Sequence, residues 1–303
     1  MLGYTALNQL SLNIAVLMTC HNRCVSTLSS LDKLFRSNLD MMSINFRVFL
    51  VDDGSTDGTT TAVEARYPQV QIIRGSGHLF WNGGMHAAFQ AANGVDYDYI
   101  FWLNDDTYLY PDALTCMLET ENTIRKQFDS QCIVVGVIRD PESKAISYSG
   151  YRFIPGAGPL AFEKIQVSDV PQPCDTMNGN CVLIPARIAR CLGNLDPEFT
   201  HAMGDMDYGF RAIDKGFKIY TAPGIAGECI KNLGRGSWMD TDLTLRARWR
   251  ALLGPKGLPL REWRLFTQRH CGRWWIIYWM KPYCLLWIRG FFKLLTNSLF
   301  ANK

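Results

Sequence analysis

The fold is constrained most by a regular alternation of apolar runs and helical patterns along residues 13–138. Five apolar runs predict buried strands, and helical spacing of apolar residues follows each of the first four. The expected strands cover residues 13–19, 46–51, 70–74, 99–103 and 132–138, and the expected helices cover 25–35, a segment ending at 66, 85–92 and 111–124. Strands and helices that alternate at this spacing form βαβ units. We therefore predict an α/β fold, a mainly parallel sheet with helices on both faces.

The alternation stops after residue 138. Residues 139–180 are rich in Gly, Pro, Ser and Asp, which predicts loops with short hairpins. Regular structure is expected again at 181–184, 186–191, 206–215 and 217–221. We predict one principal domain over residues 1–230, with halves at about 12–138 and 139–230, followed by an extension over 231–303.

Charge is distributed unevenly along the 303 residues. Residues 231–303 contain 14 Lys and Arg but only three acids, a balance of +11, whereas residues 1–230 have a balance of −8. A basic end on an acidic body indicates that one end of the chain meets a polyanion or an anionic membrane surface. Composition does not choose between them.

The remaining composition excludes several classes of protein. With 48% hydrophobic and 19% charged residues, the chain is neither disordered nor collagen-like. Its ten cysteines include no C-x-x-C pair, so we expect free thiols in a reducing compartment rather than a disulfide framework.

Polar side chains follow three of the expected strands. These segments are Thr-Cys-His-Asn-Arg at 19–23, Asp-Asp-Gly-Ser at 52–55 and Asn-Asp-Asp-Thr at 104–107. Ligands of open parallel sheets bind outside the carboxyl ends of the strands, so we expect the three segments to form one site. No G-x-G-x-x-G follows the first strand, and no G-x-x-x-x-G-K-[ST] occurs. A dinucleotide-dependent dehydrogenase and a P-loop NTPase are therefore disfavoured.

Asp105 and Asp106 indicate another way to hold a diphosphate. Mn²⁺ and Mg²⁺ take hard oxygen ligands, commonly one or two carboxylates together with substrate phosphates. Neighbouring side chains of an extended segment point in opposite directions, so one of the two should ligate the metal. We expect that residue to be Asp106, with Asp105 bonding to ribose or sugar. The alternative is a turn in which Asn and Asp bond to backbone, and the motif alone does not decide.

Five segments together resemble the family 2 glycosyltransferases, inverting enzymes of the GT-A fold, and especially their rhamnosyltransferase-like bacterial members. The resemblance runs from about Leu12 to Lys231 and continues more weakly to about Arg289. It is carried by MTCHNR (18–23), VDDGSTDGT (51–59), WLNDD (102–106), NGNCVLI (178–184) and GDMDYGFR (204–211). The second and third segments are the most specific. The resemblance implies a GT-A domain whose first half binds the nucleotide and whose second half binds the acceptor.

The resemblance also implies roles for single residues. Thr19, His21 and Asp53 would line the base pocket, with the Asp53 carboxylate accepting the N3–H of uracil or thymine. Asn104-Asp105-Asp106 stands where the family has its D-x-D metal motif, so Asn104 is expected to contact the donor. Arg23, in the first segment, is also expected to bind the nucleotide sugar.

The glycine-rich segment 74–84 is expected to lie beside the donor. Trp81 is suited to stack on a sugar or base, and Arg74 is suited to approach phosphate. We also count Asn82 among the expected donor-binding residues. A core position for Trp81, in an ordinary strand-to-helix loop, is an equal alternative.

Asp205 is the expected general base, which would take the proton of an acceptor hydroxyl. Helix N-capping is the competing interpretation of this residue, and the resemblance favours the catalytic one. Asp207 and Arg211 have the i,i+4 spacing of an ordinary surface ion pair, so Asp207 is expected to be structural. The family motif usually begins Glu-Asp, whereas Gly204 precedes Asp205 here.

Two further segments complete the expected site. Asn178, Gly179 and Asn180 would form the floor of the acceptor site, although turn chemistry also explains them. Many family members have a metal-binding His after the strand equivalent to 217–221, where this chain has Gly227-Glu228-Cys229. Glu228 is the expected metal ligand there, because a thiolate prefers softer metals.

The C-terminal segment combines charge with tryptophan. Residues 261–303 contain eight Lys and Arg, one acid and five Trp. A helix lying in the headgroup layer of an anionic membrane fits this pattern. Packing on the catalytic domain or on a second subunit is the alternative, and oligomeric state stays open. Nucleic acid is not an expected partner, because no recognition fold accompanies the basic residues.

The sequence therefore predicts a metal-dependent inverting glycosyltransferase. It would move a sugar from a UDP- or dTDP-linked donor to a hydroxyl of a glycan or lipid-linked acceptor, with Mn²⁺ or Mg²⁺ as cofactor. A sugar-nucleotide pyrophosphorylase and a non-catalytic sugar-nucleotide-binding or scaffold protein are the alternatives. No signal peptide and no spanning segment are evident, so we expect a cytoplasmic protein, free or on the cytoplasmic face of the membrane.

Overall fold

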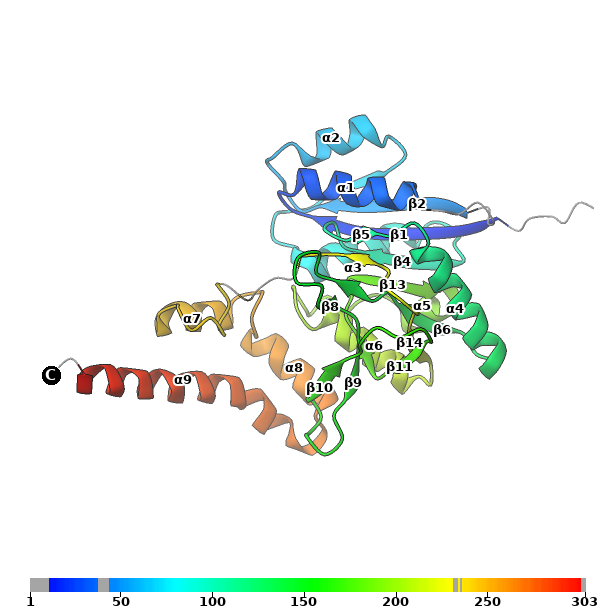
Figure 1. Cartoon of the computed structure of the whole chain (residues 1–303). Coiled ribbons are helices and arrows are strands. Elements are labelled where there is room, and N and C mark those ends of the chain that lie inside the picture. Colours follow the sequence, from blue (N-terminus) through cyan, green and yellow to red (C-terminus); the bar gives the residue numbers. More distant parts are fainter. Residues whose placement is uncertain (1–10, 38–43, 231–233, 235, 301–303) are drawn as a thin grey trace, which may run out of the picture.

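The computed structural model describes residues 11–37, 44–230, 234 and 236–300, with side chains described to residue 288 in the last helix. Its centre is an eight-stranded sheet in the order β11-β14-β6-β13-β4-β1-β2-β3 (Figure 1). The strands are β1 (Leu12–Cys20), β2 (Ile44–Asp52), β3 (Gln71–Arg74), β4 (Tyr99–Leu103), β6 (Cys132–Val135), β11 (Gln172–Cys174), β13 (Cys181–Pro185) and β14 (Lys218–Thr221).

The sheet is mainly parallel, as predicted. β1 pairs in parallel with β2 and β4, β3 with β2, and β14 with β6. β13 runs antiparallel between β4 and β6, and β11 is antiparallel to β14. The carboxyl ends of β1, β2 and β4 therefore meet at one edge of the sheet.

Helices cover both faces of the sheet because side chains alternate along each strand. Ile14 and Val16 of β1 belong to one apolar core, and Ala15 and Leu17 belong to another. The first core takes residues of α1 (Cys24–Phe35), α2 (Thr59–Arg66) and α4 (Ala113–Phe128). The second takes residues of α3 (Phe80–Ala92), α5 (Ala186–Leu192) and α6 (Gly204–Asp214).

Two smaller sheets lie beside the central one. One has the order β10-β9-β12, and the other has the order β5-β15-β7-β8. Their strands are β5 (Tyr108–Leu109), β7 (Ile138–Arg139), β8 (Ile146–Tyr148), β9 (Gly150–Phe153), β10 (Phe162–Lys164), β12 (Thr176–Met177) and β15 (Gly227–Glu228). The single strand expected at 132–138 is therefore two strands, since the chain leaves the central sheet at Gly136.

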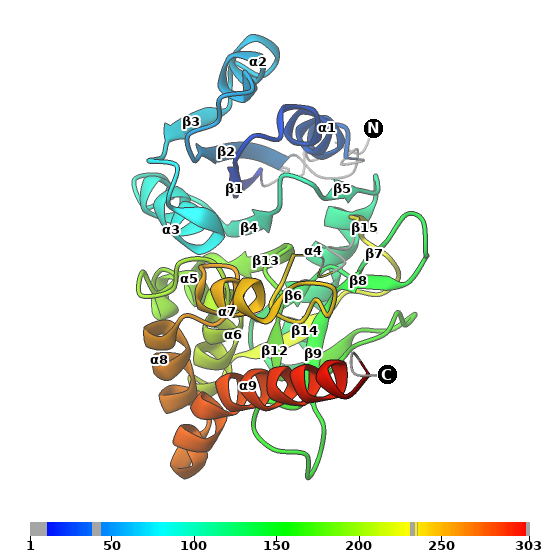
Figure 2. The same cartoon turned by 90° about the vertical axis from the view of Figure 1, so that its left-hand side faces the viewer.

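The C-terminal region is helical, with α7 (Leu245–Leu253), α8 (Leu260–His270), the short 3₁₀ helix η1 (Gly272–Trp274) and α9 (Trp275–Phe300). α8 packs on the principal domain, where Phe266 is buried with Phe199 and Phe210. α9 extends away from the body in Figure 1 and lies across the lower part of the molecule in Figure 2. Of the described helices, none combines the length and hydropathy needed to cross a bilayer. All ten cysteines are free.

Candidate active site

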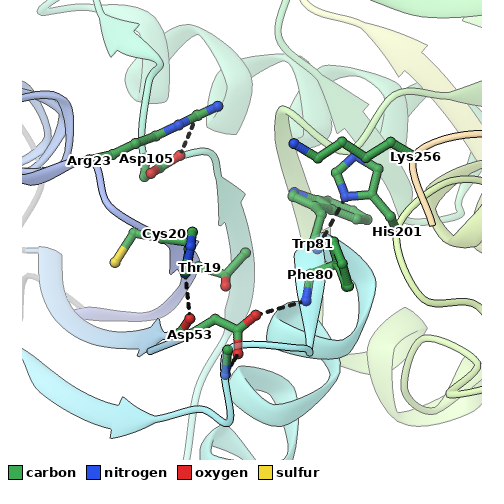
Figure 3. Close-up of a pocket in the computed structure, with 11 residues that line it drawn as sticks. Thr19, Cys20, Arg23, Asp53, Phe80, Trp81, Asp105, His201 and Lys256 are labelled. Carbon is green, nitrogen blue, oxygen red and sulfur yellow. Dashed lines mark hydrogen bonds and ion pairs between the residues drawn. The ribbon is translucent and has the colours of Figure 1, made fainter. Parts of the chain in front are cut away.

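The ends of β1, β2 and β4 enclose a cavity of about 210 Å³, called here the strand-end cavity. It is lined by Thr19, Cys20, His21, Arg23, Asp53, Gly77, Phe80, Trp81, Asp105, His201 and Lys256. Figure 3 shows Arg23 and Asp105 on one wall, Trp81, His201 and Lys256 on the opposite wall, and Asp53 at the base. Five expected donor-binding residues from the strand ends, Thr19, His21, Arg23, Asp53 and Asp105, therefore line one cavity.

A second cavity of about 350 Å³, the α6 cavity, adjoins the first, and Arg23, Trp81, Asp105, His201 and Lys256 line both. The α6 cavity adds Asn104, Asp106, Tyr148, Tyr151, Asn178, Gly179, Asn180, Ala202, Met203, Asp205 and Met206. The expected metal ligand Asp106, the expected base Asp205 and the expected acceptor segment 178–180 thus face the same space.

Asp53 fixes the loop between β3 and α3. Its Oδ1 accepts the backbone N–H of Gly77 at 2.7 Å, and its Oδ2 accepts those of Leu79 and Phe80 at 2.8 and 2.9 Å. Phe80 has a positive φ of 55°, which a bulky residue seldom adopts. The hydrogen bond to Asp53 holds this backbone conformation at the wall of the strand-end cavity. The imidazole Nδ1 of His21 in turn donates to the Asp53 carbonyl at 2.6 Å.

Asp105 and Asp106 share one guanidinium. Arg23 Nη1 donates to Asp105 Oδ1 at 3.1 Å and to Asp106 Oδ2 at 2.6 Å. The Asp105 side chain is 7% exposed and that of Asp106 is 24% exposed. Burial raises the pKa of Asp105 to about 7, against the lowering effect of the Arg23 charge. This pair therefore carries more negative charge than a single guanidinium neutralises.

The pair fits a divalent cation. Asp105 Oδ2 is buried and has no hydrogen-bond partner among the described residues, so this oxygen is free to take another ligand. Asp106 lies next to it at the edge of the cavity. No cluster of three His, Cys, Asp or Glu ligands occurs in the described part of the chain. Two carboxylates completed by substrate phosphates are a common arrangement for Mg²⁺.

Asp205 lies at the start of α6, and its carboxylate accepts hydrogen bonds from neutral groups. Its Oδ2 accepts the backbone N–H of Gly179 at 2.9 Å and the amide of Asn178 at 3.2 Å. Its Oδ1 accepts the N–H of Met206 at 2.8 Å. Burial raises the pKa of Asp205, and the hydrogen bonds from Gly179 and Met206 oppose that rise. The carboxylate is therefore oriented from both sides without being neutralised, as a proton acceptor requires.

Asp207, two residues later, is fully buried and bound to two guanidinium groups and an imidazole. Its carboxylate accepts from Arg211 Nε at 2.9 Å, Arg269 Nη1 at 3.1 Å and His270 Nε2 at 3.0 Å. Burial alone would raise the pKa of Asp207, but the His270 hydrogen bond and the charges of Arg211 and Arg269 lower it. The expected structural role and the Arg211 pair are both present. The pair is not on the open surface, however, because Asp207 is fully buried and also bonds to Arg269 and His270 of α8.

Trp81 packs against the core and also lines the cavities, so it has features of both positions expected for it. Its ring packs edge-on against the buried Trp102, and its Nε1 donates to Asn104 Oδ1 at 2.7 Å. It also lines both cavities. A Cβ on Gly179 would lie 2.4 Å from the Trp81 ring, so glycine at 179 gives the indole its space.

The structure explains why Gly204 replaces the usual glutamate before Asp205. A Cβ at this position would lie only 1.7 Å from Asn82 Oδ1. Asn82 is itself fixed, because its Nδ2 donates to the carbonyls of Asp196 and Phe199 at 2.8 and 2.6 Å. Asn82 thus joins α3 to the segment before α6, which leaves no room for a side chain at 204.

Three expected site residues lie outside both cavities. Asn82 is buried in the contacts just described. Arg74 is exposed and lines a separate hollow with the segment 54–61. Glu228 accepts from Tyr110 and Arg139 at 2.9 and 3.1 Å. The structure therefore does not bring these three side chains to the cavity that holds Asp106.

Cys229, rather than Glu228, faces Asp106. The thiol Sγ lies 3.5 Å from Asp106 Oδ1, as a donor to the carboxylate. Consecutive side chains of a strand point in opposite directions, which turns Glu228 away. Burial and the charge of Asp106 raise the pKa of Cys229 to about 12, so the thiol stays protonated. In this structure Cys229 is therefore a hydrogen-bond donor to Asp106.

His201 and Lys256 line both cavities, and neither was expected as a site residue. Burial, together with the charges of Lys256 and Arg23, lowers the pKa of His201 to about 4. The neutral ring accepts the N–H of Trp81 at 3.4 Å. Lys256 comes from the loop between α7 and α8, so the C-terminal region supplies a cation to the cavity. No sequence pattern marks either residue.

Comparison with known proteins agrees with this geometry. Residues 15–160 match the family model described as Glycosyl transferase family 2. The chain is 23% identical over 190 residues to the N-acetylglucosaminyl-diphospho-decaprenol L-rhamnosyltransferase of two Mycobacterium tuberculosis strains, CDC 1551 / Oshkosh and ATCC 25618 / H37Rv. The matched region covers 54% of this chain and spans 60% of the relatives' length.

Solved structures share the fold at low sequence identity. S. aureus TarS, residues 1–349, has a TM-score of 0.51 and 12% identity, over 84% of this chain and 69% of that one. GalNAc-T7 with UDP, GalNAc and Mn²⁺ has a TM-score of 0.57 and 13% identity, over 73% of this chain and 44% of that one. The architecture is that of the GT-A glycosyltransferases, as the sequence predicted.

Proposed function

The chain belongs to glycosyl transferase family 2 through residues 15–160, and from this premise we propose that it is a metal-dependent inverting glycosyltransferase. It transfers a sugar from a UDP- or dTDP-linked donor to a hydroxyl of a glycan or lipid-linked acceptor. The observation that carries the proposal is that Asp105, Asp106 and Asp205 line one cavity, in which only the first two are paired with a cation in the described structure.

The donor occupies the strand-end cavity in this proposal. Thr19, His21 and Asp53 surround its base, and the pyrophosphate extends toward Asp105 and Asp106. Arg23 and Lys256 supply positive charge from opposite walls of the same cavity. A bound Mn²⁺ or Mg²⁺, held by Asp106 with Asp105, would neutralise the charge that develops on the leaving diphosphate. GalNAc-T7, which has the same fold, was solved with UDP and Mn²⁺, and this supports a related cofactor here.

Transfer takes place across the α6 cavity. The acceptor oxygen forms a bond to the anomeric carbon as the bond from that carbon to the diphosphate oxygen breaks. The acceptor proton passes to the Asp205 carboxylate, and the nucleoside diphosphate leaves. Gly179 and Asn178 hold that carboxylate while it receives the proton, and its raised pKa favours general-base action near neutrality. The name of the mycobacterial relatives specifies a lipid diphosphate acceptor and a rhamnosyl group, which supports testing both first.

The test incubates the full chain with UDP-, dTDP- and GDP-linked sugars and Mn²⁺, with and without a polyprenyl diphosphate sugar. Release of nucleoside diphosphate and glycosylation of the acceptor are measured. We expect turnover with at least one donor, and its loss in Asp106→Ala but not in the control Asp169→Ala, an exposed acid outside both cavities. Donor binding without turnover would identify a binding protein. Formation of a sugar 1-phosphate on adding pyrophosphate would identify a pyrophosphorylase, and either result overturns the proposal.

A further inference from the structure

The last helix, α9, has one face against the protein. Leu286 is buried on this face, Trp279 Nε1 donates to the Leu260 carbonyl at 3.1 Å, and Tyr283 OH donates to the Leu258 carbonyl at 2.6 Å. These contacts hold α9 on the segment that begins α8. The orientation of the helix about its own axis is therefore fixed by specific contacts.

The opposite face of α9 is apolar and exposed to solvent. We call it the outer face of α9, and its members are Ile276, Ile277, Met280, Cys284, Trp287 and Ile288. Their spacing of three, four and seven residues puts them on one side of the helix. The five large side chains among them are between 45% and 61% exposed, which is unusual for a contiguous set of this size. Such a set marks an interaction surface.

Charge decides between the candidate partners of this face. Arg273 and Lys281 are exposed next to it, and residues 231–303 as a whole carry a balance of +11. A second copy of the chain would bring the same positive charge against it. An anionic lipid surface instead offers opposite charge to the basic side chains and an apolar layer to the outer face.

We propose that the outer face of α9 inserts into the interfacial layer of an anionic membrane, with the helix lying parallel to the surface. At 1.5 Å per residue, the 26 residues of α9 extend for about 39 Å. Figure 1 shows the helix projecting beyond the body on the side where β1 ends, which is the side of the strand-end cavity. Membrane docking would therefore bring the site toward the lipid surface. This inference stands on α9 alone and does not require the proposed reaction.

The experiment measures co-sedimentation of the full chain with vesicles of phosphatidylcholine alone or mixed with phosphatidylglycerol. We expect binding to the anionic vesicles only, weakening as salt is added. The double variant Ile277→Asp/Met280→Asp should bind at least about tenfold more weakly, because two apolar contacts become charged. Its matched control is Val167→Asp/Val170→Asp, which changes two exposed valines before β11 and should leave binding unchanged. Arg273→Glu and Lys281→Glu should each lower binding by about fivefold or more.

Circular dichroism and the unfolding temperature establish that each variant is folded. Two results would overturn the proposal: no binding of the parent chain to anionic vesicles, or equal loss in the outer-face variant and its valine control. A concentration-dependent dimer that Ile277→Asp/Met280→Asp dissociates, without vesicle binding, would assign the face to a second copy. Asp205→Asn should bind vesicles like the parent chain, so a failure of the proposed reaction would be distinguishable.

Discussion

Two pairs of aspartates, one at the end of β4 and one at the start of α6, use the same side chain in opposite ways. Asp105 and Asp106 share a single guanidinium, and one buried oxygen of Asp105 has no hydrogen-bond partner among the described residues. In the second pair, Asp207 is bound to two guanidinium groups and an imidazole, whereas Asp205 accepts only from neutral groups. The two carboxylates of the first pair have one guanidinium between them. In the second pair, both guanidinium groups lie beside Asp207 and none lies beside Asp205.

The difference shows that the groups bonded to a buried carboxylate, rather than its burial, determine its pKa and its role. Asp105 and Asp207 are both buried, yet the pKa of Asp105 is raised and that of Asp207 is lowered. Asp207 holds α6 and α8 together and is not free to react. Asp205 accepts three hydrogen bonds from neutral groups, two on Oδ2 and one on Oδ1, so Oδ1 keeps a lone pair that can take a proton. We therefore expect the four residues to respond differently to the same Asp-to-Asn change.

Asp205→Asn should have the largest effect. An amide keeps the size of the side chain but cannot take the acceptor proton, so kcat should fall by about 10²–10⁴-fold. The unfolding temperature should stay within a few degrees of the parent value. Steady-state rates of acceptor glycosylation at saturating donor measure the loss. Near-parent kcat in the folded variant would remove Asp205 from the role of base.

Asp207→Asn should damage stability instead. Asp207 is fully buried, and the change replaces its charge-assisted hydrogen bonds to Arg211 and Arg269 with those of a neutral amide, which should cost about 3 kcal/mol of unfolding free energy. The lowered pKa of Asp207 gives the native state a stabilisation that is present above the unfolded pKa and lost as pH falls through the folded pKa. The difference between variant and parent should therefore shrink in acid. Urea unfolding at neutral pH and at about pH 3 tests this, and a pH-independent difference would contradict it.

Asp105→Asn should increase the stability of the protein at high pH, whereas Asp207→Asn should decrease it. The pKa of Asp105 is raised to about 7, so the native state is destabilised as pH increases from the unfolded value toward 7 and beyond. The variant should therefore be more stable than the parent at pH 8, by up to about 4 kcal/mol, and similar to it near pH 4. Asp106→Asn is the control, because it removes a carboxylate from the same guanidinium at a more exposed position. Unfolding temperatures measured from pH 4 to pH 8 without metal decide the matter, and parallel curves for Asp105→Asn and the parent would contradict it.

The sequence predicts the first pair better than the second. Asp53, Asp105 and Asp106 follow apolar runs, and the rule that parallel strands end at one edge brings them together without knowledge of packing. The burial of Asp207 depends on where α8 docks, and no local pattern specifies the angle at which a helix returns to the domain. The i,i+4 spacing to Arg211 predicts one partner, but Arg269 and His270 come from more than 60 residues away.

Lys256 and His201 illustrate the same limit within the site. Each is a single residue without a motif, and each reaches the cavities only through tertiary packing. Asn82 shows the converse, because it stands in a predicted donor segment but bonds to the chain before α6. Strand register gives a third case. Whether residue 228 or 229 faces Asp106 is set by the pairing of the two-residue strand β15 with β5 and β7.

Glu228→Gln tests the register of β15. It is the change for which we expect the smallest effect on stability and turnover. Glu228 accepts from Tyr110 and pairs with Arg139 and Lys144, contacts that lower its pKa and keep it charged. A partly exposed pair of this kind contributes less than about 1 kcal/mol, so stability should change little. Turnover with Mn²⁺ should stay within about threefold of the parent, because a carboxylate turned away from Asp106 is no metal ligand. A large loss of turnover, with a matching rise in the Mn²⁺ concentration needed for half-maximal rate, would mean that β15 changes register when the donor binds.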